Sequence, residues 1–302
     1  MMANCAIGKE REFAHNAVCP GIDGDIRSLA RILWPGRYTL DGVFVALRYA
    51  SYFDASTHPQ PKSIVVAGYA SPVWIWERFE IDWRLALAKF DVPYFHMKEF
   101  TACRGPFSAP SWKSETKRAD FMATLADVTR TSNMIGIARL VSQQVFEKAN
   151  QKYLLDRRFN PYVICALECA LRAKSHIRKL YSDTAPIDYI FDQGDKGAGL
   201  LTKEMENRGL PAPIFRHSKP VPGKPEVFPT VQLQCCDFAA WELRKAHVTQ
   251  DAPEFRKYRK SLEALRDVLV TWKEYTHLED FCKENGVELR QKKGPSHHSA
   301  GA

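Results

Sequence analysis

Short strand-like segments alternate with long helix-like segments along most of the chain, and this alternation restricts the fold more than any other feature of the sequence. The first two strands are expected at 43–54 and 63–69, joined by a proline-containing turn. Ser71 and Pro72 then begin a helix in which large apolar residues recur every three or four positions. This order of elements predicts an α/β protein with a sheet flanked by helices.

The later segments continue the pattern and define the domain boundaries. Helices are predicted at 114–130, 161–181, 200–207 and 232–246, and strands at 134–141, 187–192 and 212–217. One domain is therefore expected at 43–250. It is preceded by an N-terminal appendage, 1–42, that lacks sustained periodicity. A helical extension is predicted at 251–290, because apolar residues recur at helical spacing from Phe255 to Leu269, and the tail 291–302 is expected to be disordered.

The composition is that of a globular protein with a surplus of positive charge. Hydrophobic residues make up 45% of the chain, and 43 Lys and Arg outnumber 35 Asp and Glu, for a formal net charge of +8. Such a surplus favours nucleic acid as a partner. No apolar run reaches the roughly 18 residues of a membrane span, so no membrane partner is expected. Charged residues from Lys9 to Glu12 interrupt the region where a signal peptide would be apolar, which predicts a cytoplasmic location.

Cysteine spacing and missing motifs exclude several other classes of protein. The eight cysteines show no CxxC pair, so reduced thiols are expected. Cys165 and Cys169, four positions apart on a predicted helix, remain a weak alternative as zinc ligands. The motifs GxSxG, HExxH and GxxxxGK[ST] are absent from the sequence, which disfavours a serine hydrolase, a zinc peptidase or a P-loop ATPase.

Three aspartates, Asp54, Asp192 and Asp237, are placed where strands end or where a helix faces back toward the sheet. Because the carboxyl ends of strands gather at one edge of an open α/β sheet, these acids can converge although they are far apart in sequence. Converging carboxylates repel one another unless a hard cation such as Mg²⁺ or Mn²⁺ lies between them. Each aspartate alone is more often a turn or capping residue, so the hypothesis of a metal site depends on all three.

The phrase Tyr94-Phe95-His96-Met97-Lys98-Glu99-Phe100 contributes two further candidates. Glu99 is a fourth acidic residue for the site. His96 is a candidate for orienting water or transferring a proton, and the alternative is a hydrogen-bonded structural histidine.

Five phrases resemble the family called domain of unknown function 3800, and they occur in the order typical of that family over about residues 46–247. They are Tyr52-Phe53-Asp54-Ala55-Ser56, Val66-Ala67-Gly68-Tyr69, Phe95-His96-Met97-Lys98-Glu99, Phe191-Asp192-Gln193 and Val231-Gln232-Leu233-Gln234-Cys235-Cys236-Asp237-Phe238-Ala239-Ala240-Trp241. The resemblance implies a ribonuclease-H-like mixed sheet of the retroviral-integrase superfamily and a metal-dependent nuclease. It further implies Asp54, Asp192 and Asp237 as ligands of Mg²⁺ or Mn²⁺, with Glu99 and His96 as additional catalytic candidates.

The chain departs from the family at one position that bears on activity. The family usually has glutamate after the first aspartate, and this chain has Ala55. A non-catalytic module that binds nucleic acid or protein therefore stays as an alternative to the nuclease. The basic stretch Arg256–Lys260 is interpreted as a solvated helix face, with phosphate binding as the alternative.

Overall fold

The computed structural model describes residues 48–59, 62–180, 186–194, 196–224, 226–248 and 269–290. The appendage 1–42, the predicted helix that starts at Phe255, the basic stretch Arg256–Lys260 and the tail 291–302 lie outside these residues. The helices and strands are β1 (Tyr49–Pro59), β2 (Lys62–Pro72), α2 (Val73–Lys89), α3 (Met97–Thr101), α4 (Glu115–Thr131), β3 (Ile135–Ser142), α5 (Gln143–Lys152), α6 (Pro161–Leu180), β4 (Ile187–Asp192), α7 (Ala198–Glu206), β5 (Ile214–Arg216), α8 (Val231–Val248), β6 (Leu269–Tyr275) and α10 (Glu279–Glu284). Short 3-10 turns occupy Gly105–Phe107, Pro110–Lys113 and Leu155–Arg157.

The strands form one mixed six-stranded sheet in the order β5-β4-β1-β2-β3-β6. Strands β1, β2 and β3 run antiparallel to one another in sequence order. Strand β4 joins the other side of β1 in parallel, and β5 and β6 extend the two edges in parallel with β4 and β3. The predicted α/β class, with a mixed sheet flanked by helices, is confirmed.

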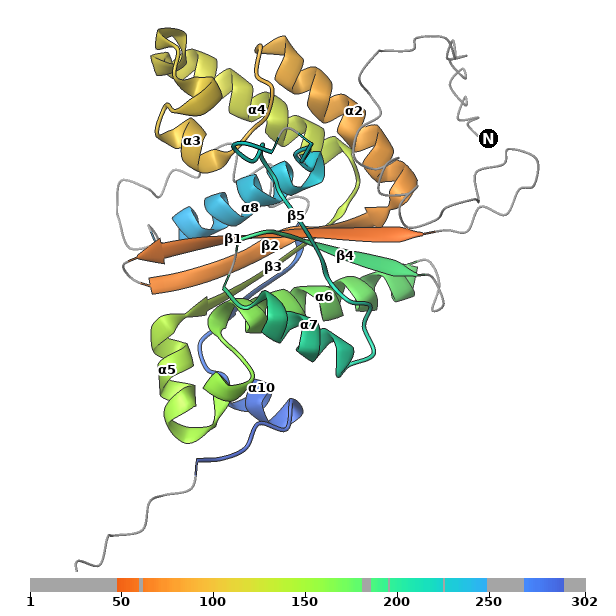
Figure 1. The fold of residues 1–302 in the computed structure, drawn as a ribbon, viewed down its shortest axis with the longest axis vertical. Coiled ribbons are helices and arrows are strands. Elements are labelled where there is room, and N and C mark those ends of the chain that lie inside the picture. The colour runs from red at the N-terminus through yellow and green to blue at the C-terminus, as the bar shows by residue number, and fades with distance from the viewer. Residues whose placement is uncertain are drawn as a thin grey trace, which may run out of the picture.

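Helices cover both faces of the sheet, which gives a three-layered body (Figure 1). On one face α8 packs across β1 and β2, and α2 and α4 lie outside α8. On the other face α6 packs across β2 and β3, and α7 packs against α6. Both layers are apolar and buried, so the central strands β2 and β3 carry nearly continuous buried runs instead of a strict alternation.

Helix α8 is buried on almost every side, from Val231 to Ala240. It lies between the sheet and α2, and two of its polar residues make contacts within the core. Gln232 donates to Glu80 of α2 at 3.1 Å, and the Cys236 thiol donates to the carbonyl of Tyr52 on β1 at 3.1 Å. The second contact fixes α8 directly over the strand that carries Asp54.

Residues 269–290, the described part of the predicted helical extension over 251–290, begin with a strand and not with a helix. Residues 269–275 form β6, which pairs with β3, and only the short helix α10 follows it. The run Val270-Thr271-Trp272 is β-branched and aromatic, so it suits a sheet edge once β3 is available as a partner. Helix α5 was also not predicted from the sequence.

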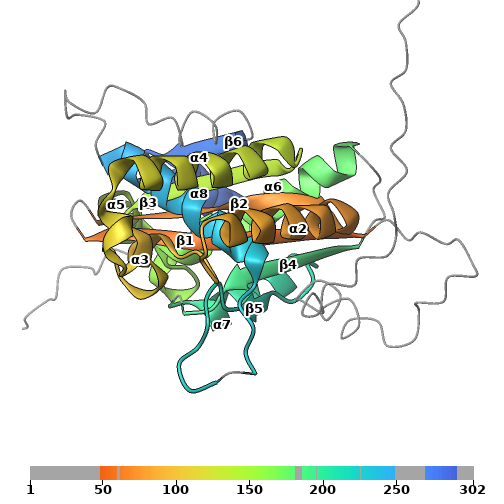
Figure 2. The same cartoon turned by 90° about the horizontal axis from the view of Figure 1, so that it is seen from above.

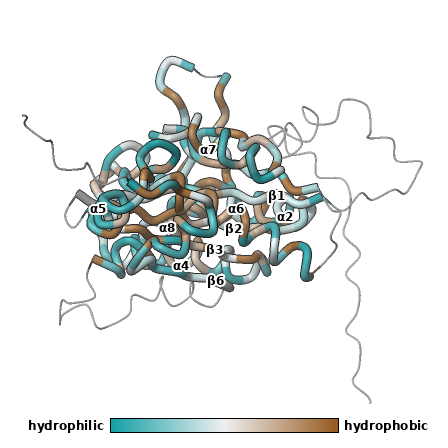
Figure 3. Tube along the Cα trace, turned by 90° about the horizontal axis from the view of Figure 1, so that it is seen from below, coloured by the Kyte–Doolittle hydropathy of each residue, from teal (hydrophilic) through white to brown (hydrophobic). Residues whose placement is uncertain are grey.

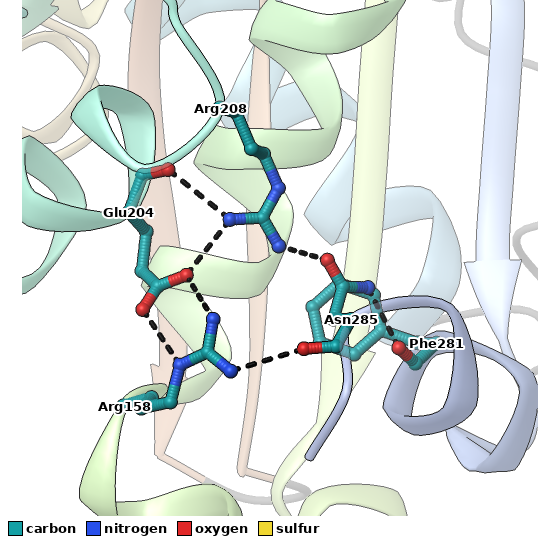
Figure 4. A network of polar contacts seen from close by, with 5 residues as sticks. All are labelled: Arg158, Glu204, Arg208, Phe281 and Asn285. Carbon is teal, nitrogen blue, oxygen red and sulfur yellow. Dashed lines mark hydrogen bonds and ion pairs between the residues drawn. The ribbon is translucent and has the colours of Figure 1, made fainter.

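A polar network holds α10 against the layer formed by α6 and α7 (Figure 4). Glu204 of α7 is buried, and its carboxylate accepts from Arg158 at 2.8 and 2.7 Å and from Arg208 at 2.8 Å. Both arginines also donate to Asn285 beyond α10, Arg158 to its backbone carbonyl at 3.0 Å and Arg208 to its side-chain oxygen. Buried apolar contacts, such as Phe159 against Phe281 at 5.2 Å between ring centroids, complete this junction.

Among the described helices, none has the length and apolar composition needed to cross a bilayer.

Candidate functional site

Asp54 and Asp192 lie side by side on neighbouring parallel strands. Phe53 of β1 is in register with Phe191 of β4, and their rings stack at 5.3 Å on the α6 side of the sheet. Because side chains alternate between the two faces of a strand, the aspartates that follow these phenylalanines point to the α8 side. Asp54 is 7% exposed and accepts the N–H of Ala55 at 2.7 Å, and Asp192 accepts the N–H of Ser218 at 2.8 Å.

Asp237 approaches the same face from α8. Its carboxylate is buried and accepts the backbone N–H of Met97 at 2.6 Å. Burial, together with the nearby negative charge of Asp192, raises the pKa of Asp237 to about 7 against the opposing effects of the Met97 hydrogen bond, Lys219 and Arg244. Burial also raises the pKa of Asp192, opposed by its contacts with Ser218 and by the charge of His217. The structure therefore brings the three predicted aspartates to one sheet face.

The carboxylate oxygens are suitable donors for Mg²⁺ or Mn²⁺, which prefer hard oxygen ligands. Within the described residues, however, no group of three or more histidine, cysteine, aspartate or glutamate side chains is arranged to hold a metal ion. Magnesium often uses only one or two protein carboxylates and completes its coordination with water and substrate phosphate. Asp54 and Asp192, adjacent on β1 and β4, fit such an open site. Their role as ligands, with Asp237, stays a prediction.

Glu99 is held by two neighbouring side chains. It accepts from the Tyr94 hydroxyl at 2.8 Å through one oxygen and from the Lys219 ammonium at 3.1 Å through the other. Burial alone would raise the pKa of Glu99, but these two hydrogen bonds and the charges of Lys219 and His96 outweigh it and lower the pKa. Because both carboxylate oxygens of Glu99 already accept hydrogen bonds, Glu99 is better suited to positioning Lys219 beside Asp237 than to binding a ligand itself.

His96 lies next to Glu99, with 4.0 Å between its Nδ1 and the nearer carboxylate oxygen. Burial and the charges of Lys219 and Lys98 lower the pKa of His96 to about 4, although Glu99 acts in the opposite direction. The ring is therefore neutral near pH 7. Its Nδ1 is buried and has no hydrogen-bond partner among the described residues. A neutral ring in this position is suited to orienting water.

Gln234, which sequence reasoning did not single out as a site residue, organises the segment that carries His96 and Glu99. Its side-chain oxygen accepts from the indole of Trp83 at 3.1 Å and from the backbone N–H of Phe95 at 3.0 Å. Gln234 and Asp237 are three residues apart on α8, so they project on the same side and bind two N–H groups of one segment. The Gln-x-x-Asp spacing was visible in the sequence, but its structural role was not.

Two cations flank the carboxylates. Lys219 follows β5 and lowers the pKa of Asp237, as does Arg244 from the last turns of α8. Arg244 donates to the Ser56 hydroxyl of β1 at 2.8 Å and lies 5.7 Å from the centre of the Trp241 ring. The sequence did not indicate a role for Lys219, because its contact with Glu99 joins residues 120 positions apart.

Glu242 is a buried acidic residue of α8, five positions beyond Asp237. Glu242 is 1% exposed, because α8 is covered by the sheet on one side and by α2 on the other.

Comparison of the chain with protein-family models, curated proteins and solved structures finds no match.

Proposed function

We propose that this protein is a metal-dependent nuclease that hydrolyses nucleic-acid phosphodiesters in the cytoplasm. The sheet order, with an antiparallel β1–β2–β3 meander and β4 parallel to β1, is compatible with a ribonuclease-H-like fold. The six described cysteines are free thiols, which is consistent with a reducing compartment.

One observation carries the proposal: Asp54 and Asp192 occupy adjacent positions on parallel strands, facing the helix that carries Asp237. Buried acids gathered on one face of a sheet destabilise the fold through mutual repulsion, so such a cluster is more often found at a functional site. The flanking Lys219 and Arg244 supply positive charge where a substrate phosphate would approach.

Each group has a distinct task in the proposed reaction. A divalent cation, when bound, supplies activation of water and neutralisation of charge on the phosphate. Asp54 and Asp192 would hold that cation, and Asp237 would complete the carboxylate set once it is deprotonated. Lys219, oriented by Glu99, and Arg244 would bind the non-bridging phosphate oxygens. Neutral His96 would orient water through its ring nitrogen.

The test is cleavage of labelled DNA and RNA by the full chain with Mg²⁺ or Mn²⁺, together with Mn²⁺ binding measured by calorimetry. Asp54→Asn and Asp192→Asn are each expected to abolish cleavage and to weaken Mn²⁺ binding at least tenfold. Asp82→Asn is the control, since Asp82 lies on the outer side of α2 in an exposed ion pair with Arg78. Cleavage that survives both site substitutions would overturn the proposal.

A catalytically inactive module that binds nucleic acid is the second candidate. It is favoured by Ala55, which leaves β1 without a second acidic residue beside Asp54, and by the lack of a three-ligand group among the described side chains. This candidate predicts nucleic-acid binding that weakens as salt increases, with no cleavage in either metal.

A further inference from the structure

The loop between β5 and α8 projects from the body beside the candidate site. We define the arm as residues 217–224 and 226–230. In Figures 2 and 3 this segment extends past the neighbouring helix α7, away from the layered body. Figure 3 also shows hydrophobic stretches within the arm. Such a projection has little core of its own, so its apolar residues require another explanation.

The base of the arm is attached directly to the site. Thr230 donates its N–H to the carbonyl of His217 at 2.7 Å, which closes the arm at its two ends. Ser218, which follows His217, donates its N–H to the carboxylate of Asp192 at 2.8 Å. Lys219 then contacts Glu99 at 3.1 Å. The position of the arm is thus set by residues of the carboxylate site itself.

Within the arm the chain is folded on itself. Val221 and Lys224 form an isolated bridge, with an N–H to carbonyl distance of 3.0 Å, and Gly223 has a φ of 74°, which favours glycine. Val227 donates its N–H to Lys224 at 3.0 Å. Prolines at 220, 222 and 229 restrict the backbone further. A restricted arm loses less conformational entropy when it binds a ligand.

Phe228 is the most exposed large hydrophobic side chain among the described residues, at 75%. It is two residues from Thr230, so its backbone lies within about 7 Å of the point where the arm closes on the site. Lys219 and Lys224 are the cations of the arm, and Arg244 lies across the site near Asp237. Exposed aromatic rings combined with positively charged side chains are used to bind single-stranded nucleic acid, and the arm carries both.

We infer that Phe228 is a stacking platform for an unpaired base, so that the arm selects nucleic acid with single-stranded nucleotides at the site. This inference rests on the proposed function, because it takes nucleic acid as the ligand. Lys219 and Lys224 contact the backbone phosphates while the phenyl ring covers the face of one base. Bases within a duplex are covered by their neighbours, so a duplex gains nothing from the ring.

The experiment measures binding of fluorescent oligothymidylate and of a duplex of equal length to the full chain in EDTA, by anisotropy. Phe228→Ala is expected to weaken single-strand binding roughly 5- to 150-fold and to leave duplex binding unchanged. The salt slope should stay the same, because no phosphate contact is removed. Phe228→Trp should retain binding, and Phe228→Leu should lose it, since leucine is apolar but cannot stack.

Trp74→Ala is the matched control. Trp74 is an aromatic residue on the outer side of α2, 60% exposed, and its removal should change nothing. The inference is overturned if Phe228→Ala binds the single strand as the unaltered chain does, or if Phe228→Leu does. It is also overturned if Phe228→Ala changes only the oligomeric state, which would assign the ring to a protein contact.

The outcomes separate this inference from the proposed nuclease. If Phe228→Ala loses single-strand binding and the unaltered chain shows no cleavage, base stacking by Phe228 is supported and the nuclease proposal is rejected. If Phe228→Ala cleaves a single-stranded substrate as the unaltered chain does, the nuclease proposal is supported and base stacking by Phe228 is rejected. If the unaltered chain binds no nucleic acid, both are rejected.

Discussion

Met97 donates its backbone N–H to the carboxylate of Asp237 at 2.6 Å, and this bond joins the first residue of α3 to the centre of α8. The same carboxylate is affected by the charge of Asp192 on β4. Asp237 therefore has a structural contact with one oxygen and a position at the candidate site. Its substitution must separate these two roles, which asparagine can do because its side-chain oxygen still accepts from Met97.

Asp237→Asn is expected to change the pH dependence of stability. The pKa of Asp237 is about 7 in the folded chain, above the value of 3.8 for an ordinary aspartate. A raised carboxyl pKa means that the folded state keeps its proton longer, so stability falls as the pH rises from about 4 to about 7. Asparagine does not ionise, so the variant avoids this loss of stability. In metal-free buffer near pH 8 the variant should be more stable by roughly 2–4 kcal/mol.

Urea unfolding of both proteins near pH 5 and pH 8 provides the measurement. The difference in unfolding free energy between variant and unaltered chain should shrink toward the lower pH. A constant difference at both values would show that Asp237 titrates normally, and a variant that is less stable near pH 8 would show that the Met97 contact needs the charged form.

Gln234→Leu should destabilise the chain by removing the acceptor of two buried donors. The indole N–H of Trp83 and the backbone N–H of Phe95 would both lose their partner, which costs roughly 2–4 kcal/mol. Gln234→Glu keeps an acceptor oxygen and should recover part of the loss. Gln143→Leu is the control, because its side-chain contact with Glu147 is exposed. Equal stability of the two leucine variants would contradict the role of Gln234 as an anchor.

Gly105→Ala tests how Glu99 is accommodated. An added Cβ would lie 2.7 Å from a carboxylate oxygen of Glu99, and Gly105 has a φ of 56°, which disfavours other residues. The substitution should cost about 1–3 kcal/mol in thermal unfolding and displace Glu99 from Tyr94 and Lys219. Gly199→Ala is the matched control. Gly199 lies in α7 with no atom near the added Cβ, so alanine should be neutral or stabilising there.

The sequence was sufficient to predict most elements because their hydrophobic periodicity is local. The helix begun by Pro72 and the strand that ends at Asp192 were both expected where α2 and β4 occur. Strand β6 was not expected, because its partner β3 is more than 130 residues away and supplies the edge on which it forms. Propensity alone does not reveal such a partner.

The site shows the same limit. Asp192 ends β4 as expected, but Asp54 lies in the middle of β1, because pairing with β2 continues the strand to Pro59. The three aspartates could still be identified, because acids on neighbouring strands and on the helix that covers them follow a known topological pattern. Lys219, Tyr94 and Gln234 were not identified as site residues. Each is placed by a hydrogen bond, either to Glu99 or to the segment before α3, and such bonds depend on the folded positions of several elements.

Glu204→Gln should weaken the junction that holds α10 to the body (Figure 4). Burial alone would raise the pKa of Glu204, but its hydrogen bonds and charge contacts with Arg158 and Arg208 lower it. A lowered carboxylate pKa stabilises the fold above the ordinary value of about 4.5, and this contribution is lost as the pH falls through the folded pKa. At neutral pH the variant should lose roughly 2–3 kcal/mol, since it leaves two partly buried guanidinium groups without a countercharge.

Hydrogen exchange gives the local readout for this variant. Amides of α10 should exchange faster in Glu204→Gln, whereas those of β1 and β2 should change only as far as global stability changes. Glu147→Gln serves as the control, since its side-chain contact is exposed. Because Asn285 receives hydrogen bonds from both arginines, exchange in α10 is coupled to the charge of Glu204 through them. Unchanged exchange in α10 would mean that apolar contacts such as Phe159 with Phe281 hold the junction without the network.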